Sequence, residues 1–301
     1  MTEPVIGRVK PKATGSSGKM PWNVGDVRIT RVVEHVMPFT VDFFAAATPA
    51  DVAAEAWLVP DFVDADGRYL MSFQTFVVEA GARRIVVDTC TGNSKDRPLI
   101  PQFDHQHRPF LKNLTAAGFA PDTIDVVVCT HLHVDHVGWN TRLVDGEWTP
   151  TFPRARYLFG AADIDYWSRS KDPLHAPAFA DSVRPVIDAG LVDAVTADTA
   201  LTGEVRIVRT PGHTPGHMSV WIDDRCVITG DVLHNPIQCR HPEWTARGDV
   251  DPDLARATRG GLLQAAAATD ALVLGTHFAG VGAGRVSSTA DGYRFTPESH
   301  D

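Results

Sequence analysis

The sequence predicts an α/β fold in which sheets are covered by helices. Short runs rich in Val, Ile or Phe have the character of strands, and a turn residue follows many of them. Stretches with helical periodicity alternate irregularly with these runs, after a first part that is rich in strands. With 301 residues, of which 44% are hydrophobic, the chain has enough apolar material for a sizeable core.

The predicted elements follow one another along the chain. Strands are predicted at residues 27–33, 72–79, 84–88, 124–129, 156–159, 205–209, 218–222, 226–229 and 272–275. Helices are predicted at residues 108–117, 161–168, 178–189 and 252–268. The last helix has the clearest beginning, because Asp251 is a good N-cap and Pro252 suits the first helical position. Gly260 and Gly261 lie inside it and argue against one unbroken helix.

One domain is expected, because neither an internal repeat nor a long linker divides the chain. Residues 1–25 are predicted to be a flexible arm, since Pro, Gly, Ser and Lys are frequent in the N-terminal segment, and residues 26–301 to be the domain. That segment lacks the apolar region of a secretory signal, and no run approaches the ~18 apolar residues of a membrane span. The scattered cysteines are predicted to be buried thiols of a cytoplasmic protein: Cys90, Cys129, Cys226 and Cys239.

The charge balance limits the partners that can be expected. The chain has 28 basic and 37 acidic residues, which gives a net charge of −9 with histidine neutral. A domain that binds nucleic acid normally carries a basic patch, so neither a nucleic-acid nor a membrane partner is predicted. One count stands out, because 13 histidines accompany only 4 tyrosines and 5 methionines.

A cluster of metal-capable side chains follows the apolar strand predicted at residues 124–129. Within Thr130-His-Leu-His-Val-Asp-His136, the side chains of His131 and His133 can share one face, and Asp135 and His136 come where the chain should turn. Imidazole nitrogen and carboxylate oxygen suit Zn²⁺ and neighbouring divalent metals. The alternative is a set of core or surface histidines with a helix-capping Asp, which this density of ligands makes improbable.

Further candidates lie where other predicted strands end. His213 stands in a tight Pro-Gly-His-Thr-Pro-Gly loop, and Asp231 and His277 each follow a short apolar strand. Asp88 ends the strand at residues 84–88 and is predicted to orient a ligand or the histidine loop. His217 opens the next strand after the loop, and a structural role is favoured for it.

In this order and spacing, these residues resemble the ligand set of the metallo-β-lactamase superfamily of metal-dependent hydrolases. The resemblance runs from about Val27 to Phe295. It implies a four-layer αββα sandwich with a site for two divalent ions at one edge of the sheets, zinc first, with Mn, Fe or Co as alternatives. The first ion would be held by His131, His133 and His213 and the second by Asp135, His136 and His277, with Asp231 bridging them.

Such a site would act as a hydrolase through a hydroxide shared by the two ions. Asp135 is assigned a second task, which is to take the proton and pass it to the leaving group. No serine or cysteine nucleophile is needed. The metal residues do not distinguish a lactone or another carboxylic ester from a phosphotriester.

Within this superfamily, the sequence resembles the branch of N-acyl homoserine lactone lactonases and methyl parathion hydrolase. His234 follows Asp231 by three residues, where many lactonases have Tyr, and is predicted either to contact the substrate or to be structural. A lactonase or esterase is therefore predicted, with a quorum-quenching lactonase included. The alternatives are an aryl phosphotriesterase, a thioesterase, an oxygen-using iron enzyme, and a non-catalytic ligand-binding member of the fold.

An aromatic-rich segment precedes the first full strands, and Trp139 follows the metal motif. An apolar wall of this kind suits a small acyl or aryl substrate. Core packing or a homodimer contact is favoured for most of the segment, with Phe44, Trp57 and Trp139 as candidate pocket residues. The expected partner is therefore a small-molecule ester or lactone, and a homodimer is a candidate assembly.

Overall fold

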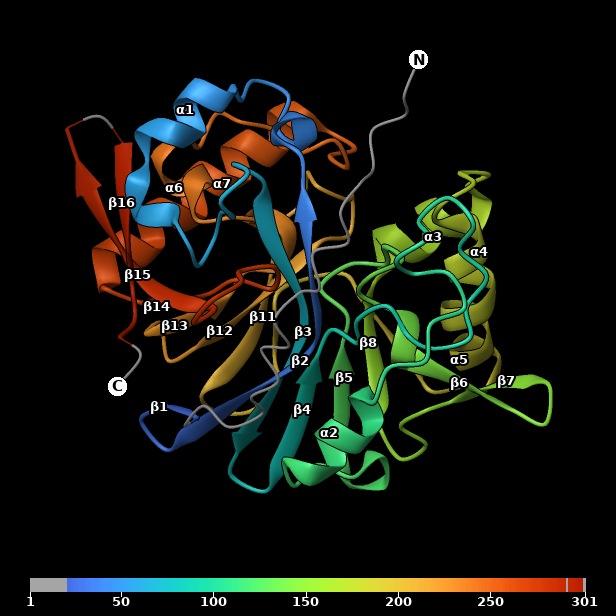
Figure 1. Cartoon of the computed structure of the whole chain (residues 1–301). Helices are drawn as coiled ribbons and strands as arrows, with labels where there is room; N and C mark the ends of the chain where they lie inside the picture. The colour runs from blue at the N-terminus through green and yellow to red at the C-terminus, as the bar shows by residue number, and fades with distance from the viewer. Residues whose placement is uncertain (1–20, 291, 300–301) are drawn as a thin grey trace, which may run out of the picture.

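Two large sheets lie against each other in the computed structural model, which describes residues 21–290 and 292–299 (Figure 1). The first sheet has the strand order β1-β2-β3-β4-β5-β8-β9. Its strands are β1 (Trp22–Val24), β2 (Val27–Phe39), β3 (Tyr69–Ala80), β4 (Arg83–Val87), β5 (Val126–Val128), β8 (Arg156–Gly160) and β9 (Val192–Val195). A separate hairpin joins β6 (Thr141–Val144) and β7 (Glu147–Pro150).

The second sheet contains the strands of the carboxyl-terminal half in sequence order. They are β10 (Thr199–Ala200), β11 (Val205–Arg209), β12 (Met218–Ile222), β13 (Cys226–Ile228), β14 (Leu272–Leu274), β15 (Ala283–Thr289) and β16 (Gly292–Pro297). The pairs β4–β5, β5–β8 and β13–β14 are parallel, so the carboxyl ends of these strands meet at one edge of each sheet.

Helices cover the outer face of both sheets (Figure 1). Those on the first sheet are α2 (Phe110–Ala116), α3 (Ala161–Arg169), α4 (Ala176–Ala178) and α5 (Arg184–Asp188), with the short turns η3 (Pro121–Thr123), η4 (Gly138–Asn140) and η5 (Phe179–Val183). Those on the second are α1 (Pro49–Ala54), α6 (Ile237–Arg240) and α7 (Pro252–Thr269), with η1 (Val41–Phe43), η2 (Ala56–Leu58) and η6 (Gly230–Val232). This arrangement confirms the predicted αββα sandwich.

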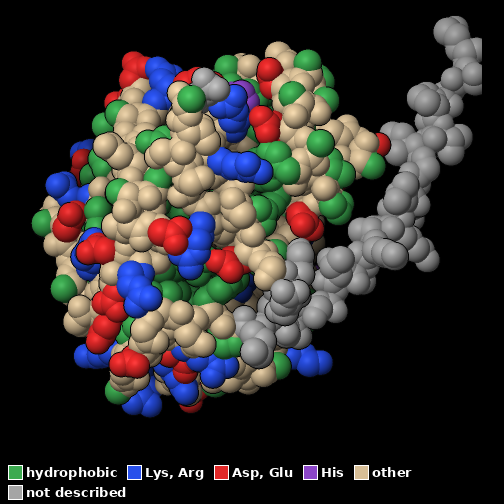
Figure 2. All heavy atoms as spheres, turned by 90° about the vertical axis from the view of Figure 1, so that its left-hand side faces the viewer, with side chains coloured by type: hydrophobic (Ala, Val, Ile, Leu, Met, Phe, Trp, Pro, Cys, Tyr) green, Lys and Arg blue, Asp and Glu red, His purple; other side chains and the backbone are tan. Residues whose placement is uncertain are grey.

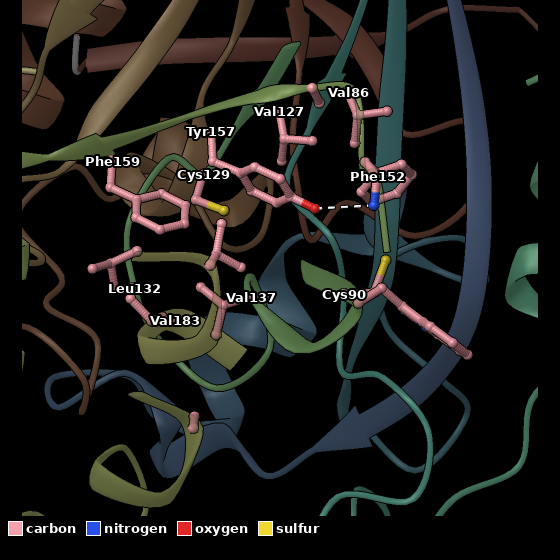
Figure 3. Close-up of a cluster of buried hydrophobic side chains, with 14 of the residues drawn as sticks. Val86, Cys90, Val127, Cys129, Leu132, Val137, Phe152, Tyr157, Phe159 and Val183 are labelled. Carbon is pink, nitrogen blue, oxygen red and sulfur yellow. Dashed lines mark hydrogen bonds between the residues drawn. The ribbon is translucent and has the colours of Figure 1, made fainter. Parts of the chain in front are cut away.

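Three apolar clusters hold the layers together. One lies between the sheets, where Ile29 and Phe76 of the first sheet meet residues such as Val220 of the second. The other two lie between each sheet and its helices. In the cluster of Figure 3, the Tyr157 hydroxyl accepts a hydrogen bond from the Phe152 N–H at 3.1 Å. Leu132 belongs to this cluster, which anchors the histidine loop that contains it.

The last predicted helix and the N-terminal segment can be compared with the structure directly. Helix α7 runs unbroken through Gly260 and Gly261, because its buried face packs on the second sheet and outweighs the weak helix propensity of glycine. Asp251 caps it as predicted, accepting from the Leu254 N–H at 3.0 Å. In addition, β1 pairs with β2, so the sheet begins inside the segment that was predicted as an arm; residues 1–20 lie outside the described residues.

The predicted helix at residues 178–189 is interrupted by a π-helical turn. Pro185 has no N–H to donate to the carbonyl of Asp181, four residues earlier. That carbonyl instead accepts from the Thr141 hydroxyl at 2.6 Å and from the ammonium of Lys95 at 3.3 Å. The turn therefore ties the helical layer to the β6–β7 hairpin.

The state of the cysteines agrees with the sequence analysis. The four cysteines are buried and free. Basic and acidic side chains intermingle over the face shown in Figure 2. In the part of the chain that is described, helices of sufficient length and apolarity to cross a membrane are lacking.

Candidate metal centre

The candidate ligands come from loops that leave both sheets at the same edge. The segment from His131 to His136 follows β5, and His213 lies between β11 and β12. Asp231 lies in η6 after β13, and His277 follows β14. The fold therefore brings together residues that are far apart in the sequence, as the histidine spacing predicts.

The first ligand group contains His131, His133, His213 and Asp231, all of them buried. The His213 Nε2 atom lies 3.0 Å from Nδ1 of His133 and 3.3 Å from Oδ2 of Asp231. The His131 Nε2 atom lies 3.6 Å from the same Asp231 oxygen. Tetrahedral ligands at 2.0–2.1 Å from a zinc ion are separated by roughly 3.3 Å. These distances therefore fit one metal ion.

The second ligand group contains Asp135, His136 and His277. The Nε2 atoms of the two histidines are 3.1 Å apart, and the Asp135 Oδ2 atom lies 3.8 Å from His136 and 3.5 Å from His277. The other carboxylate oxygen of Asp231, Oδ1, lies 3.3 Å from each of these nitrogens. Asp231 thus presents one oxygen to each group, between the two.

Hydrogen bonds fix the ring orientation of four of the five histidines. In each, Nδ1 faces an acceptor: the Thr130 hydroxyl for His131, Asp88 for His136, Asp249 for His213 and the Ser72 carbonyl for His277. The Thr130 hydroxyl gives its own proton to Asp88 at 2.9 Å, so it must accept from His131. In its neutral form, each ring with a protonated Nδ1 turns its Nε2 lone pair into the cluster, an arrangement that a cation stabilises.

Other buried atoms of the cluster also fit a metal. His131 Nε2 and Asp231 Oδ1 lack a hydrogen-bond partner among the described residues. Burial acts to raise the pKa of Asp231, but the surrounding imidazoles, His136 and His277 foremost, hold it well below its usual range. Burial opposes protonation of His213, yet Asp231 and Asp249 raise the pKa of His213 to about 9. The carboxylates therefore favour positive charge on His213, and the imidazoles favour the ionised form of Asp231.

Asp88 lies behind the second group, where the sequence predicts a ligand-orienting residue. Its Oδ2 accepts from His136 Nδ1 at 2.9 Å, and its Oδ1 accepts from the Thr130 N–H at 2.7 Å. Through Thr130 the same carboxylate reaches His131. One buried carboxylate thus orients His136 of the second group directly and His131 of the first group through Thr130.

His217 holds the backbone of Asp231. Burial lowers the pKa of His217 to about 3, so the ring is neutral at neutral pH. Its Nδ1 meets the Thr210 hydroxyl at 2.8 Å, and its Nε2 accepts from the Asp231 N–H at 2.9 Å. A Cβ at Gly230, where φ is +56°, would lie 2.5 Å from this nitrogen, so the contact requires glycine there.

Asp163 is a residue that the sequence analysis missed. It lies in the first turn of α3, where an acidic side chain is ordinarily explained by the helix dipole. Instead its buried carboxylate accepts from the N–H groups of Leu132 at 3.1 Å and Gly216 at 2.6 Å, and from the Thr214 hydroxyl at 2.9 Å. Burial raises the pKa of Asp163 to about 6. One carboxylate therefore fastens both histidine loops to each other.

Aromatic and imidazole rings border the cluster. His234 Nε2 lies 3.2 Å from Asp231 Oδ2, and its ring meets Phe43 edge-on at 5.2 Å. Phe73 meets the His277 ring at 5.1 Å and stacks on His35 at 4.5 Å. On the opposite side His175, to which the sequence analysis gave no role, stacks on His133 at 4.1 Å.

The three candidate pocket residues lie in different places. Phe44 is buried behind Phe43, with its ring 6.3 Å from His234. Trp139 is buried; its Nε1–H donates to Glu34 at 2.6 Å, and its ring stacks on Phe110. Trp57 is 37% exposed and packs on Phe62 and Phe295, which belong to the apolar cluster between the second sheet and its helices. The structure therefore brings Phe44 near the cluster and gives the two tryptophans other neighbours.

Known proteins share this sequence pattern and fold. N-acyl homoserine lactonase from Bacillus sp is 24% identical over 133 residues, which are 44% of this chain and 46% of that protein. A probable metallo-hydrolase from Methanocaldococcus jannaschii is 29% identical over 147 residues, 49% of this chain and 50% of that protein. The matches thus span about half the length of these curated relatives.

Solved structures extend the similarity in fold to nearly the whole chain. AidC, a dizinc quorum-quenching lactonase, has a TM-score of 0.78 at 22% identity and covers 93% of this chain and 97% of its own. The hydrolase AbOPH has a TM-score of 0.76 at 21% identity and covers 94% and 98%. The family match itself extends over residues 71–277, from β3 to the last candidate ligand. The chain belongs to the metallo-beta-lactamase superfamily.

Proposed function

We propose that this protein is a dinuclear metal-dependent hydrolase of lactones or other carboxylic esters of small molecules. The observation that carries the proposal is Asp231, whose two oxygens face two separate groups of imidazoles. A carboxylate in this position suits a bridge between two ions. The ligand set of five imidazoles and two carboxylates favours zinc and also suits Mn, Fe or Co.

When bound, two divalent ions supply a nucleophilic oxygen from water at neutral pH and offset negative charge that develops on the substrate oxygen. The residues of the chain have separate tasks. Asp135 is the most accessible ligand, with a side chain 19% exposed, and lies beside His277 at the open side of the cluster. We assign it the transfer of a proton to the leaving group.

His234 is proposed to contact the substrate. Its Nε2 points at Asp231, and its buried Nδ1 lacks a hydrogen-bond partner among the described residues. The ring stands between the ligand groups and the partly exposed Phe43. A donor in this position would reach a carbonyl or leaving-group oxygen, and the neighbouring phenylalanines would contact the apolar part of an acyl substrate.

The lactone preference rests on relatives named N-acyl homoserine lactonase, which are 24–25% identical over less than half of the chain. It is tested with a panel of acyl homoserine lactones, aryl esters, an aryl phosphotriester and a lactoylglutathione thioester, each with and without chelator. Lactones or carboxylic esters should be turned over fastest. A preference for the phosphotriester or the thioester would replace the ester assignment, and chelator-resistant turnover would contradict the metal assignment.

The purified protein should contain about two divalent ions per chain. Elemental analysis measures this content, and dialysis against a chelator should remove both the ions and the esterase activity together. Adding Zn²⁺ back should restore activity. A folded protein that never holds more than one ion would contradict the dinuclear assignment.

His234→Ala should lower kcat/KM for the preferred ester by roughly 10²- to 10³-fold, as expected for loss of one donor to a developing oxyanion. Metal content should stay at the wild-type level, and His234→Gln, which keeps a donor, should recover part of the rate. The matched control is the exposed His107→Ala, which should change neither quantity. Wild-type turnover by His234→Ala would remove His234 from the reaction.

A cytoplasmic location is part of the proposal, because buried free thiols suit a reducing compartment. The homodimer stays a prediction, which sedimentation of the purified protein tests.

A further inference from the structure

We infer that Asp249 positions His213 for metal binding and that the buried Arg259 holds Asp249 in place. The inference rests on the proposed metal centre and adds a pair of positioning residues that neither the histidine motifs nor the resemblance indicated. Both residues lie outside the ligand motifs, Asp249 just before α7 and Arg259 within it.

The contact between Asp249 and His213 is direct and buried. Asp249 Oδ1 lies 2.7 Å from His213 Nδ1, with side chains 0% and 3% exposed. Its second oxygen accepts from the Ala246 N–H at 2.9 Å, which fixes the plane of the carboxylate. Because a carboxylate only accepts, His213 must donate from Nδ1, and its Nε2 lone pair then faces Asp231 and His133.

The positive charge of Arg259 offsets the cost of burying the Asp249 carboxylate. Its guanidinium is fully buried and lies 3.7 Å from Asp249 Oδ2. It also donates to the backbone carbonyls of Val232 at 2.8 Å and Trp244 at 2.6 Å. Val232 is the neighbour of Asp231, so one side chain of α7 contacts both the carboxylate behind His213 and the loop of the bridging ligand.

The segment that carries Asp249 is shaped around His213. The Val250 N–H donates to the His213 carbonyl at 3.0 Å. A Cβ on Gly248 would lie 3.2 Å from Cε1 of the His213 ring, so the backbone packs directly on the imidazole. On its other side, the Arg247 N–H donates to the Phe43 carbonyl at 3.1 Å. The segment therefore connects His213 to Phe43, whose ring borders His234.

This arrangement parallels the one behind the other ligand group. There Asp88 accepts from His136 Nδ1 at 2.9 Å. With Asp249, each of the two groups has one histidine that is oriented by a buried carboxylate. Such partners raise the basicity of the ligand nitrogen and fix its direction, and losing one typically costs 10- to 100-fold in metal affinity.

The test is a titration of the metal-free full-length protein with Co²⁺, followed by visible absorption, for wild type, Asp249→Asn and Asp253→Asn. Asp253 is a matched control in the first turn of α7, with a side chain 88% exposed. In Asp249→Asn one of the two ions should bind roughly 10- to 100-fold more weakly with an altered spectrum, while the other binds normally. Asp253→Asn should match wild type.

A stability measurement and a second variant separate a positioning role of Asp249 from a purely structural one. Urea unfolding of the metal-free proteins reports stability separately, and a purely structural role would shift this midpoint while leaving the Co²⁺ affinity and spectrum of the folded fraction unchanged. That result would overturn the inference. If Asp249→Asn does not fold, Arg259→Lys decides in its place, with weakened binding of the same single ion expected. A wild type that binds no Co²⁺ would overturn the metal centre itself.

Discussion

Replacing Asp231 with Asn should remove at least one of the two ions and lower ester hydrolysis by more than the roughly 10- to 100-fold typical of outer-sphere metal partners. The amide keeps the size of the side chain but loses the negative charge that both ligand groups share. Each carboxylate oxygen lies 3.3 Å from an imidazole nitrogen of a different group, so a neutral amide serves neither group as well. Elemental analysis and the rate of ester hydrolysis measure the two effects.

The control for this substitution is Asp224→Asn, an exposed change at the β12–β13 turn. It should leave metal content and activity at wild-type values. Circular dichroism should show that Asp231→Asn is folded, because His217 still holds the backbone of residue 231 through its N–H. Unchanged activity with two ions bound would show that Asp231 does not bridge them.

Asp163→Ala should destabilise the protein by about 3 kcal/mol or more and reduce metal affinity as well. The substitution leaves two buried N–H groups and one hydroxyl without an acceptor, and each unsatisfied group costs about 1–3 kcal/mol. It also releases the loop of His131 from the loop of His213. The free energy of unfolding in urea and the Co²⁺ affinity are the measurements.

The comparison for Asp163→Ala is Asp165→Ala in the same helix. Asp165 is 66% exposed and pairs with Arg169 at the surface, so its loss should have little effect on stability. If the two variants unfolded at the same urea concentration, Asp163 would not fasten the loops.

The sequence predicted those parts of the fold in which local pattern and tertiary environment agree. The short parallel strands β5 and β13 are read correctly because they are apolar runs buried inside the sandwich. The N-cap Asp251 is recognisable because capping depends on neighbouring residues alone. The breaks at η5 and the continuity of α7 depend on distant contacts, namely Lys95 with Asp181 and the packing of α7 on the second sheet.

The candidate ligands could be named from the sequence because histidine clusters at strand ends are unusual. Among the residues that support them, Asp88 could be named in the same way, but Asp163 and Asp249 could not. Asp163 has the position of an ordinary acid in the first turn of a helix, and Asp249 stands in a loop two residues before an N-cap. Only the folded chain brings Asp249 within 2.7 Å of His213, 36 positions away in the sequence. Phe43 lies in the aromatic-rich segment before the first full strands, but its contact with His234 required the fold.

We expect two metal ions to share Asp231, and a crystal of the zinc-loaded protein tests this expectation through anomalous scattering at the zinc edge. Two peaks about 3.5–4 Å apart should appear. One should lie among His131, His133 and His213, and the other among Asp135, His136 and His277, with Asp231 touching both. A single peak in the fully loaded protein, or two peaks that do not share Asp231, would contradict it.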